Sequence, residues 1–370
     1  MSSKTTGLPR VTRQPNRICV VGLGYVGLPL ARAFLTSGYD VTGVDIDERK
    51  TSQIRAGSSP VSELTDADIQ EMLADGFKIA DVDDACRRVD VIVFAVPTPL
   101  SASLTPDVSD LTSAMIDAAQ SAENRQVWVI ESTIHPGAVE DELLPAIESV
   151  GRVHGRDFLL AHSPERVNPG DHKHRLTDIP KIVSGQSQEA LDAAIDLYSN
   201  AGFHTVPAQS IAEAASAKLL ENTYRAVNLA LVHEIAPRLT DMGIDPVEVV
   251  KLAATKPFGF QPFFPGAGVG GHCIPVDPWY FHHALFGAEG AESLISQSMQ
   301  VLAAAPGVVA ERLLETALAH TEGGPRPRIL LLGMSYKADV GDFRHAPGPD
   351  VARWLDREGA EVAYHDPFLT

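Results

Sequence analysis

One segment near the N-terminus constrains the fold more than any other part of the chain. Residues 17–47, RICVVGLGYVGLPLARAFLTSGYDVTGVDID, place a glycine-rich turn between an apolar run and an Ala/Leu-rich stretch. The apolar run at residues 18–21 is typical of a central parallel strand, and Gly38 ends the helix that follows the turn. A second apolar run then ends at Asp45. The pattern predicts a strand, a glycine turn, a helix and a second strand.

The turn has the spacing G-x-G-x-x-G, formed by Gly22, Gly24 and Gly27. The first glycine permits the tight turn, the second admits a pyrophosphate, and the third lets the helix pack on the strand. The helix N-terminus would face the phosphate charge. Asp45 can accept hydrogen bonds from both ribose hydroxyls and would repel a 2′-phosphate, which favours NAD over NADP. Lys50 either assists at the adenosine ribose or is a solvated lysine.

Short apolar runs continue to alternate with helical stretches up to about residue 205. DVIVFAV, QVWVIES, DFLLAHS, KIVSG and FHTVPA are separated by stretches such as VSDLTSAMIDAAQSA and QEALDAAIDLYSN. This alternation predicts a doubly wound α/β fold with a parallel sheet. Polar, proline-bearing turns at residues 96–99, 131–137 and 162–170 each follow a strand. Because ligands bind at the carboxyl ends of such strands, we expect these turns to line one crevice.

Composition limits the classes of partner. The chain of 370 residues has a formal net charge of −18, with 44% hydrophobic and 21% charged residues, as in ordinary soluble enzymes. This charge repels nucleic acid and anionic membrane surfaces, so neither is expected as a partner. Cys19, Cys86 and Cys273 form no CxxC motif, so we expect neither a disulfide framework nor a metal site. A free thiol indicates a reducing, cytoplasmic location.

A long helix is predicted from Ser210 to Gly243. At 1.5 Å per residue it would span roughly 50 Å, which is longer than a helix needs to be to cover a sheet. Its charged residues exclude a transmembrane span. Such helices join domains or pair with a copy of themselves, which favours a homodimer. Lys218 and Asn222 share a face of the helix with Arg225 close by, and the spacing alone leaves open whether that face is solvated or functional.

Cys273 lies in a glycine- and proline-rich segment, PGAGVGGHCIPVDPWY, at residues 265–280. The glycines let backbone and ligand approach closely, and Pro275 and Pro278 end any regular hydrogen-bond ladder. A structural cysteine would rather occupy an apolar strand, as Cys19 does in RICVVG. The segment therefore indicates a reactive thiol, with a buried structural thiol in a tight loop as the alternative.

The C-terminal part, residues 326–370, again predicts a strand, a polar loop, a helix and a strand. This order is that of the start of a second Rossmann-like domain. Two parallel strands with one helix are too small to bury a core of their own. The segment therefore either docks on the preceding domains or belongs to a fragment.

Seven motifs then point to one family: VGLGYVGLP, VPTP, EST, SPERVNPGD, KLLENTYRA, GGHCIPVDP and GMSYKADVGDFR. From about Arg17 to Thr370 the chain resembles the UDP-glucose/GDP-mannose dehydrogenase family of nucleotide-sugar 6-dehydrogenases. The basic, hydroxyl-rich segment at 1–16 contains no acidic residue and predicts a disordered tail. The resemblance implies a Rossmann-like NAD-binding domain at 17–205, a central long-helix dimerisation domain with the cysteine loop at 206–322, and an incomplete UDP-sugar-binding domain at 326–370. Family members continue beyond HDPF, so NAD binding is expected to survive in this chain and UDP-sugar binding to be weak.

The resemblance implies a four-electron oxidation of the C6 hydroxymethyl of a UDP-sugar to a carboxylate, with two NAD molecules consumed. Cys273 would capture the aldehyde as a thiohemiacetal, whose oxidation gives a thioester that water cleaves. SPERVNPGD and GGHCIPVDPWY are similar to the branch that acts on UDP-N-acetylhexosamines, especially UDP-N-acetyl-mannosamine, in polysaccharide biosynthesis. UDP-glucose oxidation, a two-electron dehydrogenase of the hydroxyacid kind and a non-catalytic NAD-binding relic are the alternatives.

The family's site residues carry over position by position. Beside the nucleophile Cys273, Lys218 and Asn222 would stabilise the oxyanion at C6. The other catalytic positions that the resemblance implies are Asp277, Glu165 and Thr133, which would order Lys218 and the hydrolytic water. The positions implied to contact NAD are Gly22, Gly24, Tyr25, Val26, Gly27, Asp45, Lys50, Thr98, Thr133 and Arg344. Those implied to contact the substrate are Arg166, Val167, Lys218, Asn222, Arg225, Tyr336 and Lys337. No metal is implied.

Overall fold

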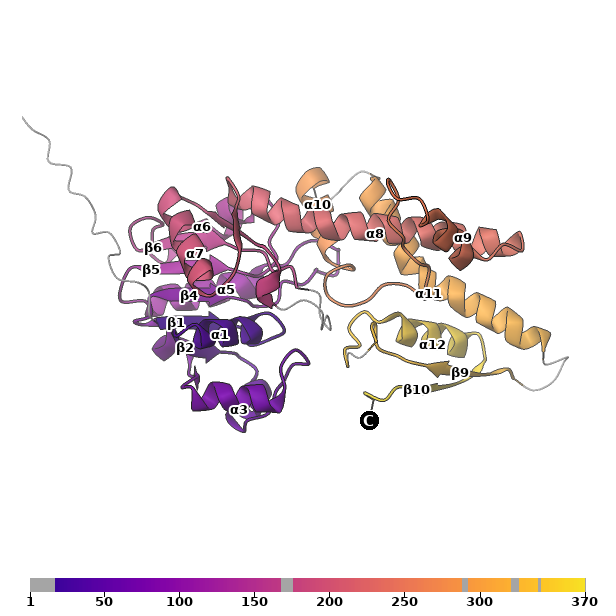
Figure 1. The fold of residues 1–370 in the computed structure, drawn as a ribbon, viewed down its shortest axis with the longest axis horizontal. Coiled ribbons are helices and arrows are strands. Elements are labelled where there is room, and N and C mark those ends of the chain that lie inside the picture. The colour runs from indigo at the N-terminus through magenta and orange to yellow at the C-terminus, as the bar shows by residue number, and fades with distance from the viewer. Residues whose placement is uncertain (1–16, 168–175, 288–291, 321–325, 339–340, 370) are drawn as a thin grey trace, which may run out of the picture.

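The computed structural model describes residues 17–167, 176–287, 292–320, 326–338 and 341–369. The tail predicted at residues 1–16 lies outside these ranges. Along the chain, Figure 1 shows a sheet with its flanking helices, then a group of long helices, and then a small unit of two strands and one helix. This order confirms the α/β class that the sequence predicts.

The sheet of the first part has eight strands in the order β3-β2-β1-β4-β5-β6-β7-β8. Their bounds are β1 Arg17–Val21, β2 Asp40–Val44, β3 Lys78–Ile79, β4 Val91–Phe94, β5 Gln126–Ile130, β6 Phe158–His162, β7 Lys181–Gly185 and β8 Thr205–Pro207. β1 pairs in parallel with both β2 and β4, so the strand order reverses between β1 and β4. A ligand crevice is expected outside the carboxyl ends of these two strands.

Two strands run against the prediction of a parallel sheet. β7 is antiparallel to β6, with Ala161 opposite Gly185 and His162 opposite Ser184. β8 is parallel to β7 and therefore also runs opposite to the first six strands. The described part of the β6–β7 connection holds a single 3-10 turn, Leu176–Asp178, and no crossover helix. A short apolar run such as KIVSG is equally apolar in either direction, so its sequence does not reveal the direction of the strand.

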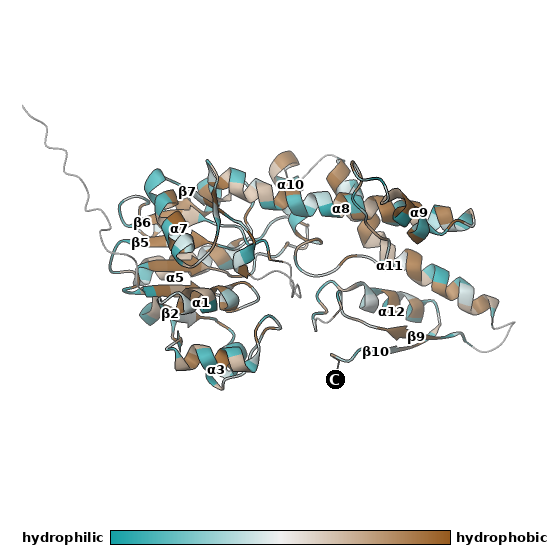
Figure 2. Ribbon diagram, in the orientation of Figure 1, coloured by the Kyte–Doolittle hydropathy of each residue, from teal (hydrophilic) through white to brown (hydrophobic). Residues whose placement is uncertain are grey.

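Helices cover both faces of this sheet. They are α1 Gly27–Thr36, α2 Glu48–Arg55, α3 Asp66–Ala74, α4 Val82–Cys86, α5 Ser109–Ser121, the π-helix Val139–Leu143, α6 Leu144–Ser149 and α7 Gln188–Asn200. Alternate residues of β1 belong to two separate cores, with Ile18 and Val20 in one and Cys19 and Val21 in the other. Figure 2 shows the strands as mostly hydrophobic, as expected for a sheet buried on both faces.

The predicted long helix is α8, Ile211–Asp241, and it begins where the Ser210 side chain accepts a hydrogen bond from the Glu213 N–H. It is followed by α9 Pro246–Ala253, α10 Asp277–Phe286 and α11 Leu294–Ala319. α8 packs on α11 through small and flexible side chains, with Ala226 and Met299 in the same buried cluster. Among the described residues, no helix combines the length and the apolar character needed to cross a bilayer.

The C-terminal unit consists of β9 Arg328–Leu332, α12 Pro347–Arg357 and β10 Glu361–His365, with β9 and β10 parallel. Val351 and Leu355 of α12 form one buried cluster with Ala310 of α11. The unit therefore docks one face of its sheet on α11, whereas Leu330 and Leu332 of β9 remain 60% and 74% exposed.

Candidate active site

The cysteine loop lies between α9 and α10 and presses against the loop that follows β9. A Cβ added at Gly270 would lie 2.4 Å from Cβ of Tyr336, and one added at Gly271 would lie 3.0 Å from the ring of the same tyrosine. The Gly271 N–H also donates to the Arg344 carbonyl, 2.9 Å away. The glycines before Cys273 are therefore required by a close approach of two loops, and they bring the C-terminal loop to the thiol.

Four side chains gather beside Cys273. Asp277 is the first residue of α10 and is 1% exposed, and its N–H donates to the Cys273 carbonyl at 2.8 Å. The Asn222 amide donates to Asp277 Oδ2 at 2.6 Å, and Lys218 Nζ lies 3.8 Å from the same oxygen. Lys218 also donates to the hydroxyl of Thr133. The shared face of α8 is therefore not a solvated surface at Lys218, which is 7% exposed, and it joins the turn after β5 to the cysteine loop.

Electrostatics keep this site in a defined protonation state. Burial raises the pKa of Cys273 and the Asp277 carboxylate acts in the same direction, whereas Lys218 and Arg344 act against them. Burial also raises the pKa of Asp277, against the effects of Lys218 and Asn222. Burial lowers the pKa of His272 to about 4, and the Arg344 and Lys218 cations contribute in the same sense. Near neutral pH the site thus holds a protonated thiol beside an uncharged imidazole.

The glycine turn has the geometry of a phosphate cradle. Gly22 has φ +94°, and a Cβ there would lie 2.5 Å from the Ala95 carbonyl oxygen. A Cβ at Gly27 would lie 1.8 Å from the Gly22 carbonyl oxygen. At Gly24 no described protein atom lies within 4 Å of such a Cβ. The fold itself thus requires glycine at the first and third positions, and the space at the second fits the pyrophosphate of NAD.

The other positions implied for NAD surround this turn. Asp45 follows β2 and accepts hydrogen bonds from the N–H groups of Leu23 and Asp47, both at 2.8 Å. Lys50 Nζ lies 3.3 Å from Asp45 Oδ2. Thr98 is buried in the turn after β4, where its carbonyl accepts the Tyr280 hydroxyl at 3.0 Å. Tyr25 and Val26, inside the turn, pack partly against the core.

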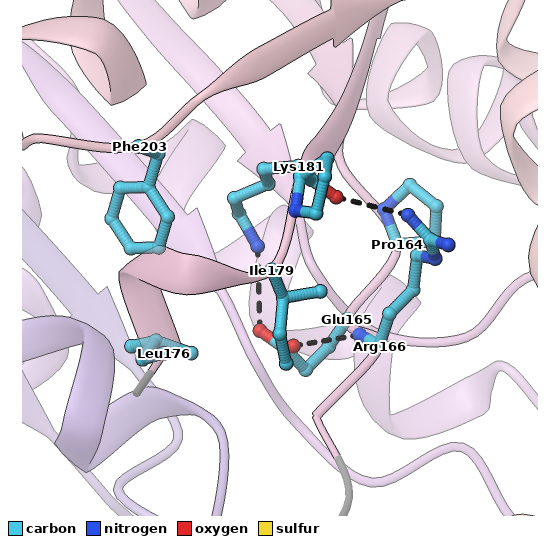
Figure 3. A pocket seen from close by; sticks show the side chains of 8 residues that line it. Pro164, Glu165, Arg166, Leu176, Ile179, Lys181 and Phe203 are labelled. Atoms are coloured by element: carbon cyan, nitrogen blue, oxygen red, sulfur yellow. Dashed lines mark hydrogen bonds and ion pairs between the residues drawn. The ribbon is translucent and has the colours of Figure 1, made fainter. Parts of the chain in front are cut away.

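The loop after β6 places Glu165 with its carboxylate fixed from two sides (Figure 3). Oε1 accepts the N–H groups of Arg166 at 2.6 Å and Val167 at 2.8 Å, and Oε2 accepts Lys181 Nζ at 3.3 Å. The cavity beside these groups has a volume of about 10 Å³, which is the lower limit for one water molecule and excludes a larger ligand.

The positions implied for the substrate are held to different degrees. Arg166 forms a bidentate ion pair with Glu221 of α8, at 3.0 and 2.5 Å, and donates to the Pro180 carbonyl at 2.9 Å. Arg225 is exposed on α8, one helical turn after the Lys218–Asn222 pair. Tyr336 and Lys337 lie in the loop after β9 and are half-buried. Residues 168–170 of the SPERVNPG turn lie outside the described residues.

Two groups of the site were missed by reasoning from the sequence, namely His272 and a buried cluster centred on Lys181. Lys181 Nζ lies 2.9 Å from Glu131 Oε2, and the Tyr198 hydroxyl donates to the other oxygen of Glu131. The available signal was an acid directly after one apolar run, QVWVIE, and a base directly before another, KIVSG. Charges at the ends of neighbouring strands are candidates for a buried pair.

Comparison with known proteins agrees with this geometry. Models of the UDP-glucose/GDP-mannose dehydrogenase family match the NAD binding domain at residues 16–201, the central domain at 212–303 and the UDP binding domain at 330–370. The chain is 34% identical over 363 residues to the UDP-N-acetyl-D-glucosamine 6-dehydrogenase of Pseudomonas aeruginosa, covering 96% of this chain and 83% of that protein.

Two solved structures extend the comparison. The UDP-D-ManNAc dehydrogenase of Pyrococcus horikoshii superposes with a TM-score of 0.87 at 34% identity, over 95% of this chain and 84% of that one. A UDP-glucose dehydrogenase from Pyrobaculum islandicum superposes with a TM-score of 0.84 at 26% identity, over 97% and 83%. The chain therefore belongs to the UDP-glucose/GDP-mannose dehydrogenase family of NAD-dependent oxidoreductases.

Proposed function

We propose that this protein oxidises the C6 hydroxymethyl of a UDP-N-acetylhexosamine to a carboxylate, through a covalent adduct on Cys273. The proposal rests above all on the gathering of Lys218, Asn222 and Asp277 beside that thiol. A two-electron dehydrogenase needs a base and a cofactor site but no thiol. Four-electron oxidation needs all three, because the aldehyde must be held between its two oxidation steps.

The first step makes the aldehyde. NAD, when bound, would accept one hydride from C6 at each of the two oxidations. The Lys218 ammonium, fixed between Thr133 and Asp277, places a positive charge where the C6 oxygen becomes negative. The Asn222 amide, itself held by Asp277, supplies a second polar group at the same place. The alcohol loses a hydride and a proton at this position.

The second step captures the aldehyde on a thiol that is protonated at rest. When the sulfur of Cys273 adds to the aldehyde carbon, the thiol proton passes to the aldehyde oxygen, so the thiohemiacetal forms with no net change in protons. Because the thiolate is the nucleophile, the raised pKa of Cys273 means that the proton must leave the sulfur as the C–S bond forms. The positive charges of Lys218 and Arg344, which act against the rise, favour this loss. Loss of a hydride and a proton from the adduct then gives the thioester.

Water completes the reaction. It attacks the thioester carbon, the C–S bond breaks, and the departing sulfur takes up a proton. Glu165 is the carboxylate that we assign to this water, because the SPERVNPGD motif places it at the position implied to order the water, and its negative charge acts on the Cys273 thiol. In balance, one alcohol, two NAD⁺ and one water give one carboxylate, two NADH and three protons.

The N-acetylhexosamine assignment has its own support. Two relatives at 34% identity carry names for UDP-GlcNAc and UDP-ManNAc oxidation, whereas the UDP-glucose dehydrogenase is 26% identical. The SPERVNPGD and GGHCIPVDPWY motifs favour UDP-N-acetyl-mannosamine as the first candidate. A nucleotide-linked uronic acid suits consumption by glycosyl transfer into a polysaccharide.

The decisive experiment is the stoichiometry of the complete reaction. The purified protein is incubated with excess NAD and a limiting amount of UDP-N-acetyl-mannosamine, UDP-N-acetyl-glucosamine or UDP-glucose. We expect two NADH, one uronate and three protons per sugar consumed with an N-acetylhexosamine. One NADH with a ketone product would assign the protein to the two-electron class. NAD binding without turnover of any sugar would favour the relic.

A further inference from the structure

Lys181 is a buried ammonium with two carboxylate partners. It is the first residue of β7, its side chain is 5% exposed, and Nζ lies 2.9 Å from Glu131 Oε2 and 3.3 Å from Glu165 Oε2. Burial alone would lower the pKa of Lys181, but the two carboxylates hold it above its ordinary value. The side chain therefore stays charged, and Figure 3 shows it reaching towards Glu165 from the strand.

The two carboxylates are in different situations. Glu131 is 1% exposed, and both of its oxygens are occupied, one by Lys181 and the other by the Tyr198 hydroxyl. Glu165 lies in the loop that leads to the active site, and its charge acts on Cys273. Glu131 thus anchors the ammonium in the core, and Glu165 is the partner through which Lys181 could influence the chemistry.

Most of the hydrogen-bond acceptor positions of the Glu165 carboxylate are already occupied. A carboxylate has about four acceptor positions, two on each oxygen. On Oε1 both positions are taken by the N–H groups of Arg166 and Val167. On Oε2 one is taken by Lys181. Among the partners that the described residues supply, one position is left, on Oε2, and its direction is set by the bond from Lys181.

We propose that Lys181 is a positioning residue for the hydrolytic step, which holds Glu165 Oε2 so that its last lone pair accepts a proton from the water that cleaves the Cys273 thioester. The bond between water oxygen and thioester carbon forms, the C–S bond breaks, and the water proton passes to Glu165. Lys181 touches neither substrate nor sulfur in this scheme. The inference rests on the proposed function, because only a thioester requires this step.

The test separates hydrolysis from oxidation in Lys181→Met. NADH formation is followed in a rapid-mixing experiment with excess NAD and the N-acetylhexosamine nucleotide that the wild type consumes. We expect an initial burst of two NADH per site at close to the wild-type rate. The steady phase should be slowed by about tenfold to a hundredfold, because misplacing a reacting group by about 1 Å costs up to that factor.

Two further measurements make the result specific. Mass spectrometry of the quenched Lys181→Met protein should show the uronyl adduct on Cys273 accumulating during the steady phase. Lys251→Met is the matched control, because Lys251 is exposed on α9 and pairs only with Glu248 among the described residues. It makes the same chemical change away from the site and should show wild-type kinetics. The melting temperature of each variant reports on the fold.

Additional variants keep the inference open to contradiction if Lys181→Met fails to fold. Lys181→Arg retains the charge with a different donor geometry, so its steady phase should slow selectively, by less than a tenfold factor. Glu131→Gln keeps the bond between Lys181 and Glu165, so its steady phase should slow less than that of Lys181→Met.

Three outcomes would overturn the inference. One is an equal slowing of burst and steady phase in a folded Lys181 variant, and another is an unchanged steady phase. The third is a loss in Glu131→Gln as large as in Lys181→Met, which would mean that Lys181 acts through Glu131. A wild type that yields one NADH per sugar would instead overturn the proposed function, and this inference with it.

Discussion

The guanidinium of Arg344 lies over the ring of Tyr25, with Cζ 5.1 Å from the ring centroid. Tyr25 belongs to the glycine turn after β1, and Arg344 belongs to the loop between β9 and α12. The Asp342 carboxylate holds the same guanidinium, with Nη2 2.6 Å from Oδ2. The C-terminal loop is thereby fastened directly over the turn that fits the NAD pyrophosphate.

Loss of Arg344 should therefore weaken NAD binding. A cation–π contact contributes about 0.5–1 kcal/mol at a partly exposed position, and the lost positive charge near the phosphates adds to it. For Arg344→Ala we expect the dissociation constant for NAD to rise about threefold to tenfold, measured by calorimetry. Arg353→Ala is the control, because Arg353 is exposed on α12 and pairs with Asp350. Equal affinities in the two variants would remove Arg344 from the cofactor site.

The glycines of the turn should divide into two classes. Gly24→Ala adds a methyl group where no described protein atom lies within 4 Å, so the melting temperature should be retained while NAD affinity falls at least tenfold. Gly27→Ala drives Cβ to 1.8 Å from the Gly22 carbonyl, so it should lower the melting temperature as well. Thermal unfolding with and without NAD measures both effects. Full NAD affinity in Gly24→Ala would place the pyrophosphate elsewhere.

Loss of the Cys273 thiol and loss of the Lys218 ammonium should impair different stages of the reaction. Cys273→Ser should oxidise the alcohol slowly but release no uronate, because a serine adduct is not activated as a thioester is. Lys218→Ala should lose roughly a hundredfold or more in rate, the amount typical of one acid/base or oxyanion group. Single-turnover NADH formation and uronate analysis distinguish the two. Lys251→Ala controls for loss of a lysine, and wild-type rates in both site variants would leave these residues with structural roles only.

The pH dependence of the protein's stability should reflect the titration of Glu131. Burial raises the pKa of this carboxyl from 4.5 to about 7, so the folded protein binds its proton more tightly than the unfolded chain does. This contribution to stability is complete below pH 4.5 and is lost as the pH rises through 7. The melting temperature of the wild type should therefore fall relative to that of Glu131→Gln over this range. Parallel curves for the two proteins would contradict the raised pKa.

A stripe along α8 supports the predicted homodimer. Leu220, Tyr224, Leu231 and Ile235 are between 39% and 58% exposed, and their spacing places them on one side of the helix. We expect a dimer by sedimentation analysis, and a shift towards monomer in Leu231→Glu. Leu332→Glu changes an exposed leucine of β9 and should leave the dimer intact. A wild-type monomer at micromolar concentration would refute the pairing.

Much of this architecture could be predicted because local rules decide it. The spacing of Gly22, Gly24 and Gly27 between a strand and a helix specifies the turn, and the predicted helix from Ser210 to Gly243 is α8 within two residues at each end. The direction of β7 could not be predicted, because a buried apolar run contains no directional signal. Strand direction depends on the connection, which is a tertiary property.

The site shows the same division. Lys218 and Asn222 share a face by helical spacing alone, so a local rule brings them together. Lys181 and Glu131 are brought together by the sheet, since β5 and β7 flank β6. No spacing in the sequence relates these two residues, and only the strand order makes their charges neighbours.

The contact between Gly270 and Tyr336 links two loops that belong to different parts of the chain. Tyr336 occupies the space that a side chain at position 270 would need. The residue allowed at position 270 therefore depends on the residue at position 336. A chimera whose cysteine loop brings a side chain at position 270 would inherit a steric collision with Tyr336, and one whose C-terminal loop brings a small residue at position 336 would inherit a hole near the nucleophile.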